Sequence, residues 1–121
     1  MAVVIPVLDE VNHLPLLLAD LEAQDLPASE FDVLVLDGGS SDGTRDLLDQ
    51  HVPRTAHGFA VLENPGKTVP HARNIAMAHL SDDVGVVVEL IGHVRISPGH
   101  LSNRRRACLL YTSPSPRDCK T

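Results

Sequence analysis

The stretch FDVLVLDGGSSDGT, residues 31–44, contains the transition that decides the fold. Its apolar run ends at Asp37 and passes directly into two glycines, two serines and a second aspartate. A short, continuous apolar run is typical of a strand buried on both faces, as in a parallel sheet. The loop after it is either a tight turn, for which Asp and Gly are common residues, or a nucleotide-binding loop that receives a carboxylate.

Segments of strand and helix character alternate on both sides of this stretch. The apolar runs predict strands over 2–6, 32–37, 59–63 and 84–90. The helical periodicity predicts helices over 13–24, 42–51 and 69–80, with N-caps at Asn12, Ser41 and Thr68. This order predicts an α/β fold in which helices cover both faces of one parallel sheet.

Polar residues follow each expected strand directly. Asp9, Asp37, Asn64 and the segment IGHVR, residues 91–95, occupy these positions. Ligands of such sheets bind at the carboxyl ends of the strands. The sequence therefore predicts a ligand site at that edge of the sheet.

Composition excludes several classes of function. The 121 residues suffice for one domain, and the net charge of −6 argues against a nucleic-acid-binding surface. No run approaches the roughly 20 apolar residues of a membrane span, and the N-terminus has no signal-peptide pattern. The two cysteines, Cys108 and Cys119, both lie close to the C-terminus. We therefore expect a cytoplasmic protein.

The last fourteen residues, CLLYTSPSPRDCKT, differ from the rest of the chain. They have neither strand nor helix periodicity. They also resemble the translation, in one reading frame, of a transposase adapter used in DNA sequencing libraries. We therefore expect a domain over residues 1–107 and an unstructured, adapter-derived tail over 108–121; a genuine disordered terminus is the alternative.

A dinucleotide-binding Rossmann domain is the first candidate for the site. Asp37 stands where an acid would bind a ribose hydroxyl. The first strand-to-helix turn, however, reads PVLDEVN and has no glycine, so it lacks the G-x-G-x-x-G element that approaches a pyrophosphate.

Three other motifs resemble the family 2 glycosyltransferases, which have the GT-A fold. VVIPVLDE, residues 3–10, is similar to their V-I-P-x-x-N-E element, with Asp9 in place of the usual Asn. LDGGSSDGT and the Ala72-Arg73-Asn74 triplet match two further elements in the same order. GHVRISPGHL, residues 92–101, resembles transferases of the succinoglycan and exopolysaccharide type.

The resemblance implies a nucleoside-diphosphate-sugar site. In it, Asp37 accepts a hydrogen bond from the base, and flexible glycines allow the backbone to approach the nucleoside. Each residue also has a plain structural explanation: Asp37 as a turn former, Glu10 as a first-turn helix acid and Arg73 as a solvated charge. The implied binding residues are Pro6, Val7, Glu10, Asp37, Gly39 and Arg73.

This sequence departs from the family pattern at the family's metal-binding element. The resemblance implies a divalent cation, Mg or Mn, whose Asp ligand aligns with Ile91. An isoleucine side chain has no ligand atom. His93 remains a candidate ligand through a neutral imidazole, and an exposed loop histidine is the alternative. Glu89 is two residues away, at another place in the site.

The catalytic base of an inverting member would come after the metal element, so no catalytic residue is assigned. We therefore expect the N-terminal, donor-binding half of an enzyme that acts on a saccharide or lipid-linked acceptor. Any membrane association would come from downstream segments. A non-catalytic nucleotide-binding or interaction module is the alternative that Ile91 favours, and a nucleotidyltransferase or dehydrogenase-like domain is a distant third.

Overall fold

The computed structural model describes residues 1–52, 58–80 and 85–110. Strands and helices alternate along the chain, as the sequence predicts. The elements are β1 (Ala2–Val7), α1 (Leu14–Glu22), a 3-10 turn (Ala28–Glu30), β2 (Asp32–Asp37), α2 (Thr44–His51), β3 (Gly58–Glu63), α3 (Val69–His79), β4 (Val87–Glu89) and α4 (His100–Leu110).

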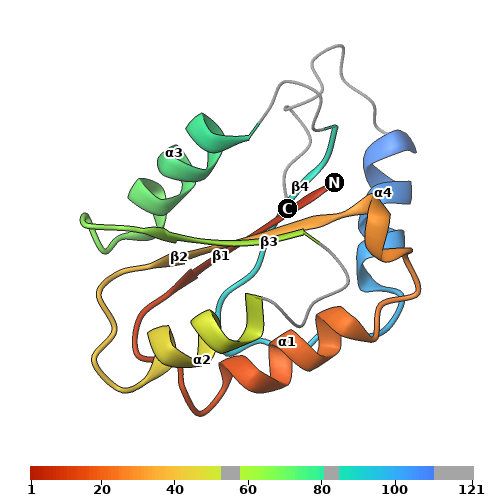
Figure 1. Cartoon of the computed structure of the whole chain (residues 1–121). Coiled ribbons are helices and arrows are strands. Elements are labelled where there is room, and N and C mark those ends of the chain that lie inside the picture. The colour runs from red at the N-terminus through yellow and green to blue at the C-terminus, as the bar shows by residue number, and fades with distance from the viewer. Residues whose placement is uncertain (53–57, 81–84, 111–121) are drawn as a thin grey trace.

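The four strands form one sheet in the order β3-β2-β1-β4, and every pairing is parallel. This confirms the predicted α/β fold. The register places Val7 beside Asp37, so the predicted site segments after β1 and β2 leave the sheet as neighbours. Figure 1 shows α3 on one face of the sheet and α1 and α2 on the other.

Each face of the sheet has its own apolar cluster, because successive strand residues point to opposite faces. One cluster joins valines and Ile5 of the strands to the buried leucines of α1 and to Leu48 of α2. The other joins Val4, Leu34 and Leu36 to two alanines of α3. Four leucines at helical spacing form the buried face of α1: Leu14, Leu17, Leu18 and Leu21.

Pro6 lies inside the central strand β1 without disturbing the ladder. The Val4 carbonyl accepts from the Leu90 amide, so alternation along β1 turns the nitrogen of Pro6 toward β4 as well. β4 pairs only with residues 2–4 and has ended at that level. The missing N–H of proline therefore costs no ladder hydrogen bond. Within residues 85–90 of the strand predicted over 84–90, regular pairing covers Val87–Glu89, so the prediction is too long there; residue 84 lies outside the described residues.

The helix starts differ from the predicted caps at two of three positions. α1 begins after His13 rather than Asn12. α2 begins after Gly43 rather than Ser41; Gly43 has a φ of 100° and follows a turn made by Asp42. Thr68 caps α3 as predicted, accepting from the His71 amide. The apolar Val69, in the first turn of α3, is 45% exposed.

Helix α4 was not predicted. It runs through the expected boundary at residue 107 to Leu110, so the expectation of no regular structure from Cys108 onward is wrong for its first three residues. Leu101 at its start is fully buried against the cluster on the α1 face. Residues 111–121 lie outside the described residues, and their assignment as a tail stays a prediction. No helix within the described ranges has the length and apolar character needed to cross a membrane.

Candidate functional site

The loops that follow β1 and β2 leave the sheet at its carboxyl edge (Figure 1), and hydrogen bonds hold them together. The Gly38 amide continues the ladder by donating to the Val7 carbonyl at 3.0 Å. The Asp9 amide donates to Ser40 Oγ at 2.9 Å. The Ser41 amide donates to Asp9 Oδ1 at 2.8 Å. Asp9 adopts a φ of 53°, a left-handed conformation that Asp and Asn tolerate better than other residues.

Thr44, at the start of α2, connects the same two loops from inside the protein. Its side chain is fully buried. Its hydroxyl accepts from the Glu10 amide at 2.9 Å and donates to Asp42 Oδ1 at 2.5 Å. The bond from Thr44 lowers the pKa of the Asp42 carboxyl. The Thr44 hydroxyl thus has a partner both as acceptor and as donor. Because Asp42 also accepts from the Val11 amide, the loop after β1 is fixed to the start of α2.

Asp37 is 3% exposed and organises its own loop. Its Oδ1 accepts from the Gly39 amide at 3.2 Å and from the Ser40 amide and hydroxyl at 3.0 and 2.7 Å. Its Oδ2 lies 3.9 Å from a guanidinium nitrogen of Arg45, which also contacts Glu63. Gly39 has a φ of 97°, which favours glycine. Asp37 is therefore a turn former through one oxygen, while its second oxygen contacts Arg45 at the longer distance and no other side chain among the described residues.

The loop after β3 completes this edge, and sequence reasoning gave it little weight. The Asn64 amide donates to the Asp37 carbonyl, and its side chain donates to the Thr68 carbonyl. Lys67 has a φ of 61° and its Cα lies 3.6 Å from where a Cβ on Gly38 would stand. The Asn-Pro-Gly turn before Lys67 was the available signal that a basic residue reaches this edge.

Glu10 meets the segment that follows β4. Nδ1 of His93 lies 3.3 Å from Glu10 Oε1. Gly92 packs so closely that a Cβ there would stand 2.9 Å from Cγ of Glu10 and 3.1 Å from Cγ1 of Val7. A turn, in which the Val94 amide donates to the Ile91 carbonyl, brings the His93 ring back toward Glu10. The structure thus joins three predicted site residues, Val7, Glu10 and His93.

The residues here do not fit the divalent cation that the family resemblance implies. The side chain at the expected ligand position, Ile91, is apolar and 48% exposed. The carboxylate of Glu10 is engaged with His93. Glu89 is paired with Arg73. Over residues 1–52, 58–80 and 85–110, no group of three His, Cys, Asp or Glu side chains is placed to hold a metal ion.

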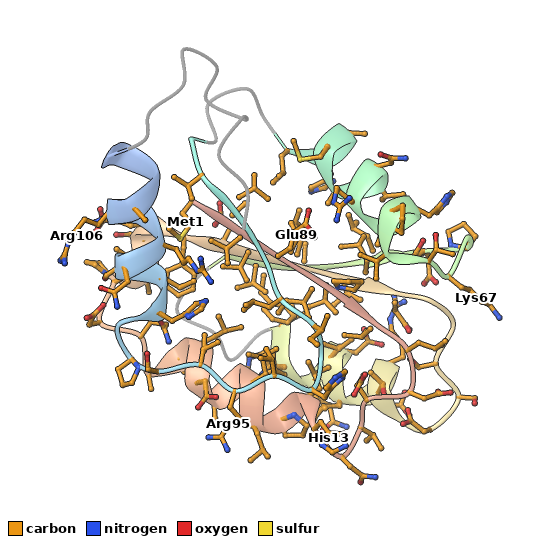
Figure 2. The ribbon with its side chains drawn as sticks, turned by 180° about the vertical axis from the view of Figure 1, so that it is seen from behind. Met1, His13, Lys67, Glu89, Arg95 and Arg106 are labelled. Carbon is orange, nitrogen blue, oxygen red and sulfur yellow. The ribbon has the colours of Figure 1, made fainter. Side chains whose placement is uncertain are left out.

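Arg73 lies apart from the other predicted site residues. Its guanidinium donates two hydrogen bonds to Glu89, at 2.6 and 2.9 Å, and this hydrogen bonding raises the pKa of Arg73. Glu89 is the register partner of Val4, three residues before the edge where Val7 pairs with Asp37. Figure 2 shows Glu89 over the middle of the sheet, away from His13 and Lys67 at the edge. A role for Arg73 in binding stays a prediction.

Two cavities among the described residues lie elsewhere. One of about 260 Å³ is lined by the starts of β2 and β3 and by the end of α3, including Asp32, Gly58 and Leu80. One of about 240 Å³ is lined by the end of α1 and the following loop. Neither includes Asp37, so a cleft between Asp37 and the segment from Pro6 to Glu10 stays a prediction.

Comparison with known families gives one match. The chain matches the family model described as Glycosyl transferase family 2 over residues 2–103. A comparison with curated protein sequences gives no match.

Several solved structures have a similar fold. S. aureus TarS 1-349 in complex with UDP-GlcNAc has a TM-score of 0.73 and 23% identity, over 90% of this chain and 31% of that one. S. aureus TarS has a TM-score of 0.72 and 20% identity, over 91% and 19%. The mannosyltransferase PcManGT from Pyrobaculum calidifontis, in complex with GDP-Man and Mn2+, has a TM-score of 0.76 and 23% identity, over 93% and 32%. The predicted GT-A fold is confirmed, and the chain spans a third or less of these structures.

Proposed function

The chain belongs to glycosyl transferase family 2, and we propose that it forms the donor-binding half of an enzyme that transfers a sugar from a nucleoside-diphosphate sugar. The observation that carries the proposal is the union of the loops after β1 and β2 around Asp37. It brings two of the three family motifs to one edge of the sheet. Structures of similar fold contain UDP-GlcNAc in one case and GDP-Man in another, which supports a donor of this class.

In the proposed complex, the base lies against the end of β1. Pro6, Val7 and Glu10 surround the base and ribose, and Gly39 allows the backbone to approach the nucleoside. Asp37 Oδ1 is occupied by its own loop. Oδ2 is therefore the atom that would accept a hydrogen bond from a base N–H, after a small opening of the loop.

The proposed reaction inverts the anomeric centre. An acceptor hydroxyl attacks the anomeric carbon, the new oxygen–carbon bond forms, and the bond to the diphosphate breaks with its electron pair leaving on the diphosphate. A carboxylate base takes the proton of the hydroxyl. We assign that base to none of the residues described here and propose that it belongs to a longer parent protein. No step is derived through a divalent cation, because the residues around Ile91 do not fit one.

The acceptor proposed is a saccharide or a lipid-linked acceptor, in exopolysaccharide or cell-envelope glycan synthesis. This follows the resemblance of the segment from Gly92 to Leu101 to transferases of that type. The proposed location is the cytoplasm, at the inner face of the plasma membrane in a full-length parent. One observation, Ile91 at the metal position, favours a second candidate: a nucleotide-binding module without catalysis.

Calorimetric titration of the chain with UDP-GlcNAc, GDP-mannose and NAD tests this proposal. We expect one of the two sugar nucleotides to bind and NAD not to bind. Binding of NAD alone would favour the dehydrogenase-like alternative, and binding of none of the three would favour an interaction module. Release of UDP or GDP in the presence of a glycan acceptor then separates the enzyme from the non-catalytic module.

A further inference from the structure

We propose that the nucleoside-diphosphate site of this chain works without a divalent cation, and that Ile91 is the residue that removes it. The inference rests on the proposed function, since it concerns how the same site receives a diphosphate. It departs from the cofactor that the family resemblance implies.

The first step is the chemistry of position 91. The segment after β4 is the place where the resemblance puts a carboxylate that holds the cation against the leaving diphosphate. Mg and Mn prefer oxygen ligands, and the side chain of Ile91 has none. This side chain is 48% exposed, so it faces solvent at the site edge and is not needed in either apolar cluster. Its presence therefore removes a ligand without adding to the core.

The second step is that nearby carboxylates cannot easily replace the missing one. The Glu10 amide donates a hydrogen bond to Thr44 Oγ1, and Oε1 of Glu10 contacts His93. Gly92 packs against the Glu10 side chain, since a Cβ on Gly92 would stand only 2.9 Å from Cγ of Glu10. Glu89 lies on the α3 face, where both of its oxygens accept from Arg73. A cation bound together with a diphosphate needs one or two carboxylates from the protein. Among the described residues, the carboxylate that remains beside position 91 is that of Glu10, and it is already engaged with His93.

The third step is the charge available to a diphosphate at this edge. Lys67 comes from the loop after β3, and its Cε lies 3.9 Å from where a Cβ on Gly39 would stand. The Lys67 side chain therefore reaches the glycine loop after β2, which the sheet order separates from the segment after β4 by strand β1. It supplies positive charge to a bound nucleotide and does not replace a ligand at position 91. A Lys side chain binds phosphate as a point charge and needs no metal.

Titration of the chain with UDP and with GDP, in MnCl2 and in EDTA, tests the inference. We expect the affinity to be the same in both solutions within about two-fold, whereas coupled ligands typically change each other's affinity about 5–150-fold. Mn2+ alone, followed by the loss of its free EPR signal, should not bind. A fall of about ten-fold or more in EDTA, or tight binding of Mn2+ alone, would overturn the inference and leave the proposed function standing. Absence of nucleotide binding in both solutions would instead overturn the proposed function and this inference with it.

Two variants make the test specific to position 91. Ile91→Asp restores a carboxylate beside Glu10 and His93, and we expect Mn2+ to tighten its nucleotide binding about ten-fold. Ile91→Asn has nearly the same shape without the charge, and we expect it to behave like the parent chain. An Ile91→Asp variant that folds, as judged by its thermal melt, and gains no response to Mn2+ would contradict the role given to this residue.

Discussion

The carboxylate of Asp9 accepts a 2.8 Å hydrogen bond from the Ser41 amide, although the two residues follow different strands. The Asp9 amide in turn donates to Ser40 Oγ. The loops after β1 and β2 therefore form one unit. The family's usual Asn could accept the same hydrogen bond and tolerate the same φ of 53°. Asp9 is thus a substitution that preserves the function of the position.

Asp9→Ala should destabilise the chain, whereas Asp9→Asn should not. Alanine loses the acceptor for Ser41 and is strained in the left-handed conformation, which together cost about 1–3 kcal/mol. Asparagine retains both properties. Urea unfolding of the two variants measures this difference. Equal stability of Asp9→Ala and the parent chain would show that the loops do not depend on this contact.

Thr44→Val should release the Glu10 amide. The substitution keeps the shape of the buried side chain but removes the hydroxyl that pairs with Glu10 and Asp42, at a cost of about 1–3 kcal/mol. Hydrogen exchange of the Glu10 amide should accelerate in Thr44→Val and stay slow in Thr44→Ser, which keeps the hydroxyl. Protection that persists in Thr44→Val would contradict the hydrogen bond.

The fold was predictable because its signals are local. Apolar runs marked the strands, and the four buried leucines of α1 lay at helical spacing in the sequence. Helix α4 could not be predicted in this way, since its sequence has no apolar face at helical spacing. Over residues 100–107 it is held by the buried Leu101 and by polar contacts of Leu101, Ser102 and Arg105 with Gln24, Asp25 and Glu30. The cap of α2 was misplaced because Asp42, rather than Ser41, makes the turn that starts the helix.

The candidate site was predictable only in part. Asp37 and Glu10 follow strand ends, which the topology brings to one edge. Thr44 was not singled out, because its buried contacts with Glu10 and Asp42 join residues far apart in sequence. The pairing of Arg73 with Glu89 depends on how α3 lies over β4, and no sequence spacing encodes that arrangement.

Gly92→Ala should disturb the Glu10 side chain. The added methyl group would stand 2.9 Å from Cγ of Glu10 and 3.1 Å from Cγ1 of Val7, and such overpacking costs about 1–3 kcal/mol. Gly85→Ala is the matched control, because its methyl group would meet nothing within 4 Å. We expect urea unfolding to separate the two variants. Equal stability would mean that Gly92 does not pack closely on Glu10.

The ion pair of Asp20 with Arg95 should make stability depend on acid pH. Hydrogen bonds from Arg95 hold the pKa of Asp20 below its usual value of 3.8. A carboxyl whose pKa is lowered by folding stabilises the protein above its unfolded pKa, and this contribution is lost as the pH falls through the folded pKa. Thermal melts should therefore show the parent chain more stable than Asp20→Asn at about pH 6, with the difference shrinking below about pH 4. A constant difference over that range would contradict the assignment.

Asp37→Asn separates the two roles of the Asp37 carboxylate. Asparagine keeps the Oδ1 that accepts from Gly39 and Ser40, so the loop should hold its shape. In place of Oδ2 it presents an amide nitrogen, which cannot accept a hydrogen bond from a base N–H. The longer contact with Arg45 is also lost, at little cost, because Arg45 has further partners in Glu63 and Asp49.

The most direct test is calorimetric titration of UDP and GDP into the parent chain and into Asp37→Asn, with thermal melts of both proteins. We predict that the melting temperatures agree closely and that affinity for the bound nucleotide falls by about 1–3 kcal/mol, the usual cost of leaving a hydrogen-bonding group without its partner. Unchanged affinity for both nucleotides in a variant that melts like the parent would contradict the account, and Asp37 would then serve the turn alone.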